Sequence, residues 1–363
     1  MASLEASRRR AQLALLASGA EFAFGDAGDC PLPPDRLAAL DAASPGVEAV
    51  HEDGLTARVF KLRVGDRHIA VKVARSECLV QNDDGRTSFL NELQRHAELR
   101  RLRESGVALP GVVAPFYGSL RTGMIVSPWV DGERVDRFDA RRIRQPLETG
   151  RTLIAHGFFE WDFSPGNLID DGRQVWLFDF GYMYRFDPLT QFNSAGDGRD
   201  CPQFHLAERI ETRNAFAWLL ALEQRDGLDV ALAGFRTIKQ AALDAYVDLR
   251  ARLAERGADT TVIGRLDAIT PRWSAALAGD LGALYLQEGW RSHVLDLDDD
   301  LQGQTCTPTT LARADWLIAT ASRAYAALRA GDALFGPDAA LSHDALVRRY
   351  RDKRTQATAY QLR

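Results

Sequence analysis

Apolar residues along this chain first follow the spacing of helices and then that of strands. Residues 4–18 carry apolar residues among charges, and residues 34–43 carry theirs on one helical face. The two patterns predict two short helices within an N-terminal extension, 1–46. Beyond this extension apolar and polar residues alternate, which predicts five strands: 47–51, 57–64, 67–74, 112–120 and 122–130. Because tight turns such as Gly65-Asp66 connect the first of them, we expect an antiparallel sheet within residues 47–130.

Helical spacing dominates the rest of the chain. Residues 86–104 have an apolar face and are followed by Gly106, which predicts a helix packed on the sheet. After a helix at 141–156 and a hairpin at Asp171-Gly172, the remaining predicted elements are helices: 204–225, 234–256, 273–290, 309–330 and 342–358. The expected fold class is therefore α+β, with a small five-stranded lobe at 47–130 and a larger, mostly helical lobe at 131–363.

Composition excludes several classes of protein. The 363 residues are 46% hydrophobic and 26% charged, as in globular proteins with a large core, and the net charge of -5 gives no reason to expect a nucleic-acid partner. The four cysteines form no CxxC pair, so neither a zinc site nor a disulfide framework is indicated. No apolar run approaches the ~18 residues of a membrane helix, and Glu5 argues against an export signal around Arg8-Arg9-Arg10. We therefore expect a cytoplasmic protein without a transmembrane segment.

The candidate chemistry lies between residues 156 and 181, where the pattern DxxxxN is followed by DFG. Asp162 and Asn167 stand in a loop, and Asp179 ends the second strand of the hairpin. Phosphoryl transfer needs oxygen ligands for a divalent metal and one further carboxylate that orients the attacking hydroxyl and takes its proton. Asn167 and Asp179 suit the metal, Mg²⁺ or Mn²⁺, and Asp162 suits the base.

With these residues the sequence resembles the protein-kinase-like superfamily, which includes Ser/Thr kinases, aminoglycoside and choline phosphotransferases and lipopolysaccharide-sugar kinases. The resemblance implies a bilobal fold that binds ATP. The strand Ile69-Ala70-Val71-Lys72 resembles the VAIK strand of kinases, with Ala70 beside the adenine and Lys72 at the phosphates. A lysine on the inner face of a strand needs an anion, and the resemblance implies that Glu92 also pairs with it, with Glu98 as the alternative.

The resemblance also implies an adenine site and a phosphate loop. In the hinge after the fifth strand Pro128 cannot donate a hydrogen bond, so we expect the Ser127 carbonyl and the Trp129 amide to bind the adenine edge. The glycine-rich loop is degenerate, and Gly54 is its one glycine that would allow close approach to the phosphates.

One feature departs from the protein-kinase pattern, and another bears on the acceptor. Glu160 and Trp161 precede Asp162, so the arginine of the HRD motif is missing. Residues 182–201 are expected to form a mobile surface loop that suits an activation or substrate segment, with Thr190 and Ser194 as the nearest hydroxyls for self-modification.

The acidic run 296–300 lacks the glycine and glutamate of a calcium loop and is expected to be a solvated loop.

These observations predict an ATP- and Mg²⁺-dependent phosphotransferase that acts on a hydroxyl acceptor. The first hypothesis is an atypical Ser/Thr protein kinase, because the long loop after Gly181 favours a protein acceptor. A small-molecule or sugar kinase is the alternative, since a pocket for such an acceptor could lie in the helical half. A nucleotide-binding scaffold without catalysis and a nucleotidyl transferase are further alternatives.

Overall fold

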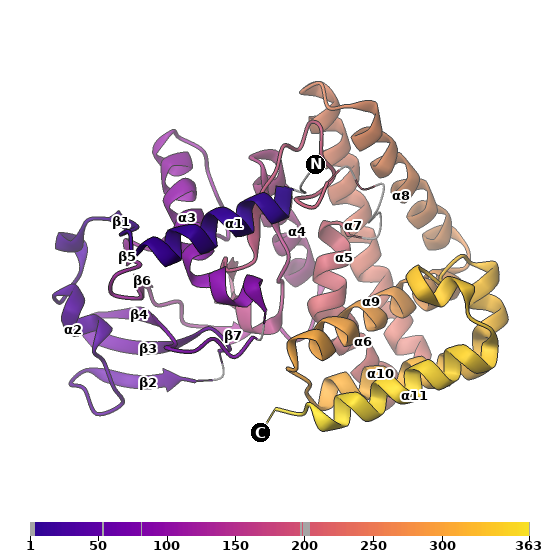
Figure 1. The fold of residues 1–363 in the computed structure, drawn as a ribbon. Helices are drawn as coiled ribbons and strands as arrows, with labels where there is room; N and C mark the ends of the chain where they lie inside the picture. The colour runs from indigo at the N-terminus through magenta and orange to yellow at the C-terminus, as the bar shows by residue number, and fades with distance from the viewer. Residues whose placement is uncertain (1–3, 53, 81, 197, 199–203, 363) are drawn as a thin grey trace.

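The computed structural model describes residues 4–52, 54–80, 82–196, 198 and 204–362. A sheet-rich N-terminal region lies beside a helical C-terminal region, which agrees with the predicted α+β class (Figure 1). No helix of the described part combines the length and apolar character that crossing a membrane requires.

The main sheet has six strands in the order β1-β5-β6-β4-β3-β2, and each neighbouring pair is antiparallel. Their bounds are β1 Ala23–Gly25, β2 Val47–His51, β3 Ala57–Val64, β4 Arg67–Ala74, β5 Tyr117–Ser119 and β6 Met124–Pro128. The prediction of five strands was wrong because β1, in the N-terminal extension, joins the edge of the sheet beside β5. A strand of three residues carries too little alternation to be recognised, and its partner lies far along the chain.

The two faces of β4 have different surroundings. Ile69, Val71 and Val73 are buried with Leu37 of the short helix α2, Pro34–Ala38, on the outer face. Ala70 and Lys72 point to the opposite face, where helix α3, Asp83–Glu104, packs. The alternation of the sequence therefore gives the correct inner face.

The N-terminal helix α1, Leu4–Ser18, lies against α3 (Figure 1). Arg8 and Arg9 both pair with Asp84, at 3.1 and 2.8 Å, and the buried Gln12 donates to the side-chain oxygen of Asn91 at 3.0 Å. Together with β1, this contact makes residues 4–40 part of the sheet-rich region and not a separate helical extension.

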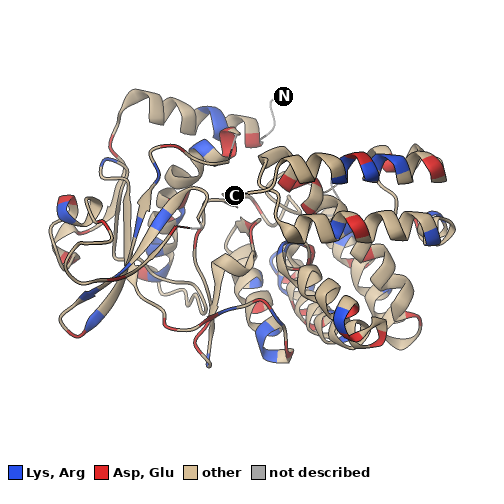
Figure 2. Ribbon diagram, turned by 90° about the horizontal axis from the view of Figure 1, so that it is seen from below, with Lys and Arg blue, Asp and Glu red and all other residues tan. Residues whose placement is uncertain are grey.

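The C-terminal region is built from α4 Ala140–Ala155, α5 Leu206–Ile210, a π-helix Glu211–Ala215, α6 Phe216–Asp226, α7 Leu228–Glu255, α8 Thr260–Ala278, α9 Leu281–Gly303, α10 Pro308–Ala330 and α11 His343–Ala359. Single-turn 3₁₀ segments are Ala27–Asp29, Pro165–Asn167 and Gly336–Ala340. Basic and acidic residues are interspersed along the outer helices (Figure 2). Some of them pair, as Arg354 of α11 does with Asp315 of α10.

Two predictions in this region were wrong. Residues 273–290 are not one helix, because α8 ends at Ala278 and Asp280 caps a new helix, α9, by accepting from the Ala283 amide. The acidic run 296–300 is not a solvated loop, because it lies within α9 and Asp296 is buried. Its carboxylates meet arginines of neighbouring helices, and this pairing is a tertiary property that the local sequence does not show.

Short strands frame the candidate catalytic segment. β7 Glu133–Arg134, β9 Leu168–Asp170 and β10 Val175–Leu177 form one small sheet, and β8 Phe158–Glu160 pairs with β11 Met183–Arg185. The segment after Gly181 is therefore not a mobile surface loop in its described part, since β11 is paired and Phe192, Asn193 and Ser194 are buried. Residues 197 and 199–203, including Cys201, lie outside the described residues.

The N-terminal extension should contribute to stability as core. Phe24 of β1 is 6% exposed and packs with Leu93, Ala97 and Ile125. We expect Phe24→Ala to lower the free energy of unfolding in urea by about 3–5 kcal/mol, through lost burial and a cavity. The exposed Val247, replaced by alanine, is the control and should change it by less than about 0.5 kcal/mol. Equal small effects would show that residues 4–40 are an appendage.

Candidate active site

Lys72 occupies the centre of the site and contacts two carboxylates from different parts of the chain. Its Nζ lies 2.6 Å from Oε2 of Glu92 on α3 and 2.7 Å from Oδ2 of Asp179 after β10. Glu98, the alternative partner, instead contacts Arg95 at 3.1 Å and Arg185 at 3.9 Å. The structure therefore brings three of the expected site residues together.

Burial and charge together set the protonation of these groups. Burial alone would raise the pKa of Glu92, but the Lys72 ammonium and a contact with His96 lower this pKa to about 2. Burial also raises the pKa of Asp179, and Lys72 offsets this only in part. Burial lowers the pKa of Lys72, but the two carboxylates more than reverse this effect. One ammonium against two carboxylates leaves an excess of negative charge, which a divalent cation would offset.

The backbone around Asp179 is held by an asparagine that the sequence pattern did not single out. Asp179 has a left-handed φ of 65°. The buried Asn91 Nδ2 lies 3.1, 3.0 and 2.8 Å from the carbonyl oxygens of Phe180, Gly181 and Met183. Because Asn91 also accepts from Gln12, α1, α3 and the DFG segment form one hydrogen-bonded unit.

Asp162 and Asn167 lie together in the loop after β8. The 3₁₀ turn Pro165–Asn167 brings Asn167 back toward Asp162, and Asn167 Nδ2 donates to Oδ2 and to the backbone carbonyl of Asp162, each at 3.1 Å. Since these bonds use the amide nitrogen, the side-chain oxygen of Asn167 is left to act as a metal ligand.

Glu160 occupies a place beside Asp162 at the end of β8. Its Oε1 accepts from the Asp162 amide at 2.7 Å, while its buried Oε2 meets no hydrogen-bond partner among the described residues. Burial raises the pKa of Glu160 well above its usual value, and the nearby charges of Asp162 and Asp179 add to this effect. Both effects favour the uncharged form, and Oε1 orients the loop through the Asp162 amide.

The expected adenine and phosphate contacts have a mixed outcome. Ala70 lies on the same face of β4 as Lys72, and Ser127 pairs opposite it in β6. The Trp129 amide, however, donates to the His68 carbonyl at 3.2 Å, so the sheet already uses this donor. A contact of this amide with adenine would require it to leave His68.

Gly54 lies in the loop between β2 and β3. A side chain there would collide with the Ala57 carbonyl at 2.5 Å, so the turn needs glycine. Arg75, which the sequence pattern did not indicate, donates from Nε to the Gly54 carbonyl at 2.8 Å and so helps to hold the loop.

The two hydroxyls that we considered for self-modification differ in access. Ser194 is 2% exposed and accepts from Trp161 Nε1 at 2.8 Å, so it cannot serve as an accessible acceptor. Thr190 is exposed and donates to Asp187 at 2.9 Å.

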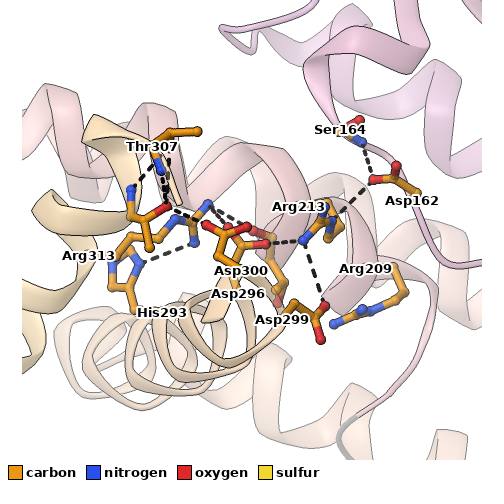
Figure 3. Close-up of polar contacts among 12 residues, drawn as sticks. Asp162, Ser164, Arg209, Arg213, His293, Asp296, Asp299, Asp300, Thr307 and Arg313 are labelled. Atoms are coloured by element: carbon orange, nitrogen blue, oxygen red, sulfur yellow. Dashed lines mark hydrogen bonds and ion pairs between the residues drawn. The ribbon is translucent and has the colours of Figure 1, made fainter. Parts of the chain in front are cut away.

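Arg213 is a site residue that sequence reasoning missed. It projects from the π-helix, and its Nε donates to Oδ1 of Asp162 at 3.2 Å (Figure 3). The two residues are 51 positions apart, and a single arginine in a helical segment has no local signal of such a contact.

The donor set fits Mg²⁺ bound together with phosphates. The described residues contain no group of three or more His, Cys, Asp or Glu side chains suited to a metal. Mg²⁺ often uses one or two protein oxygens and completes its shell with water and substrate phosphates, so the carboxylate of Asp179 and the amide oxygen of Asn167 would suffice.

Comparisons with known proteins give little beyond this geometry. No protein-family model matches the sequence, and no curated protein does. Among solved structures, the bifunctional kinase-methyltransferase WbdD is 16% identical, with a TM-score of 0.32. The match covers 54% of this chain and 46% of WbdD, which is less than two thirds of that protein's length. A likeness at this TM-score carries no argument about function.

The buried charges around Lys72 should make stability depend on pH in a defined direction. In Lys72→Met, Glu92 and Asp179 lose their cation, and we expect a loss of about 3–5 kcal/mol at pH 7 by urea unfolding. Without the lysine, the pKa of each buried carboxyl rises, so the folded variant takes up protons as the pH falls from 7 to 5. The difference in free energy of unfolding between the variant and the wild type therefore becomes smaller over this range. In the wild type, the contribution of ionised Glu92 to the free energy of unfolding is constant over this range. That contribution is lost only between pH 4.5 and about 2.

Lys61→Met is the matched control for this experiment. Lys61 lies on the neighbouring strand and pairs with Glu48 at 3.8 Å and the exposed Asp131 at 3.2 Å. Its loss should cost less than about 1 kcal/mol, equally at both pH values. A pH-independent cost in Lys72→Met would contradict the assigned pairing.

Proposed function

We propose that this protein is an ATP- and Mg²⁺-dependent phosphotransferase with a bilobal, protein-kinase-like fold, which moves the γ-phosphate to a hydroxyl acceptor. The observation that carries the proposal is the contact of Lys72 with both Glu92 and Asp179, next to the Asp162–Asn167 pair. A buried lysine with two carboxylates, one of them on a left-handed turn, is costly unless the arrangement serves a charged ligand.

Each residue has a part in the proposed reaction. Lys72 binds phosphate oxygens, Glu92 keeps Lys72 in place, and Asn167 and Asp179 hold Mg²⁺, which offsets the charge of the phosphates. The acceptor oxygen forms a bond to the γ-phosphorus while the bond to the β,γ-bridging oxygen breaks, and ADP leaves with that electron pair. Asp162 takes the hydroxyl proton and later releases it to water, so the products are the phosphorylated acceptor and ADP.

The acceptor class is the open part of the proposal. From the sequence, a protein hydroxyl is the first expectation, because a long loop after Gly181 favours a protein acceptor. Since β11 is paired and Phe192, Asn193 and Ser194 are buried, the segment no longer favours a protein over a small molecule or sugar. Among the hydroxyls of this segment, Thr190 is the exposed candidate for self-modification.

Nucleotide binding should require the metal. We expect calorimetry to detect ATP binding with Mg²⁺ and not with EDTA, and Asp179→Ala to abolish the metal-dependent binding, because the variant lacks a carboxylate ligand. Asp226→Ala, at the exposed end of α6, is the control and should bind as the wild type does. Unchanged binding by Asp179→Ala would reject the metal assignment.

Turnover should depend on Asp162 more than nucleotide binding does. Asp162→Asn keeps the size of the side chain but removes the base, so turnover should fall by a factor on the order of 100 or more while ATP binding persists. The assay follows ADP release with sugars, aminoglycosides and proteins as acceptors, together with the mass of the intact chain. A phosphate mass on the chain would support a protein acceptor, and an AMP mass would replace phosphoryl transfer with nucleotidyl transfer. ATP binding without turnover of any acceptor would favour the scaffold hypothesis.

A further inference from the structure

The π-helix Glu211–Ala215 is held in place by buried polar contacts on nearly every residue. Glu211, fully buried, pairs with Lys239 and, at 2.7 Å, with Arg291. Arg313 of α10 donates to the Thr212 carbonyl at 3.0 Å, and Asn214 donates to the Val135 carbonyl at 2.8 Å. Buried charges are costly unless paired, and π-turns occur preferentially at functional sites, so the placement of this segment needs a reason.

Arg213 is the residue of this segment that reaches the candidate active site. Its guanidinium connects two elements: Nε donates to Asp162 Oδ1 at 3.2 Å, and Nη1 lies 2.5 Å from Asp296 and 3.7 Å from Asp299 on α9 (Figure 3). Asp296 is itself held by Arg313 at 3.0 Å. The acidic run of α9 thus forms the support of an arginine that contacts the proposed base.

The hydrogen bonds to Asp162 define which oxygen can take part in the reaction. Oδ1 accepts from Arg213 Nε and from the Ser164 amide at 3.3 Å, whereas Oδ2 accepts from Asn167 at 3.1 Å. A carboxylate has about four acceptor positions, two on each oxygen. The described residues therefore fill both positions of Oδ1 and one of Oδ2, which leaves one position on Oδ2.

We propose that Arg213 is a positioning residue of the phosphotransfer reaction, which holds Asp162 so that Oδ2 meets the acceptor hydroxyl and takes its proton. This inference rests on the proposed function. The charged groups around the guanidinium come from several elements: Asp162, Arg209, Asp296, Asp299, Asp300 and Arg313. Arg213 brings a positive charge from a distant helix to Asp162, which has none in its own segment Glu160-Trp161-Asp162.

The test compares Arg213→Met and Arg213→Lys with the wild type, using the acceptor that gives turnover. We expect Arg213→Met to lower kcat on the order of 10- to 100-fold with an unchanged KM for ATP, because Arg213 contacts neither Lys72 nor Asp179. Arg213→Lys keeps the positive charge but should still lose kcat, because one ammonium cannot replace the guanidinium fork.

Two double-mutant cycles separate positioning from a general effect on the fold. Arg213→Met should have little further effect on kcat in an Asp162→Asn background, and the Tm changes of the two substitutions should not add. The control is Arg250→Met, which removes an exposed ion pair with Asp267. It should leave kcat unchanged, and its Tm change should add to that of Asp162→Asn.

The outcomes distinguish this inference from the proposed function. If the wild type turns over and Arg213→Met keeps its kcat, the inference is wrong while the function stands. If the wild type shows no turnover with any acceptor, the proposed function fails. The Tm cycle then still tests whether Arg213 and Asp162 interact. Additive Tm changes of the two substitutions would show that Arg213 does not act on Asp162.

Discussion

The buried ammonium of Lys72 is the constraint on which the arrangement of the N-terminal region depends. Its charge must be met by Glu92 and Asp179, which come from a helix and from a turn and lie 87 positions apart in the chain. This requirement places α3 against the inner face of β4 and brings the turn after β10 to the same point. A buried cation with two anions also leaves a negative excess, which suits the site to a divalent metal.

The contacts of Asn91 connect this charged site to the N-terminal helix. The side-chain nitrogen of Asn91 donates to backbone carbonyls of the DFG segment, and its side-chain oxygen accepts from Gln12. Residues Arg8 and Arg9 add ion pairs to the first turn of α3. The position of Glu92, the next residue on α3, therefore depends on α1 as well as on the sheet.

The helical region uses the same physical principle with different residues. Lys239 is fully buried and is neutralised by Glu211 and Glu288, while Asp296 of α9 meets Arg213 and Arg313. Such pairs favour one arrangement of their helices, because breaking any of them would leave an uncompensated charge in the interior. In this way α7, α9 and α10 determine where the π-helix lies and which way Arg213 points.

Elements whose pattern is local could be predicted from the sequence. The alternation in β3 and β4 identified the inner face that carries Lys72, and the order of Asp162, Asn167 and Asp179 around a hairpin indicated the candidate site, because turns and alternation follow from neighbouring residues. The edge strand β1, the break between α8 and α9 and the burial of Ser194 were missed, as were the contacts of Asn91 and Arg213. The break is local, at the helix cap Asp280. The other features emerge with the tertiary structure, because each depends on a partner far along the chain, and the energy of a buried charge or hydrogen bond depends on that partner.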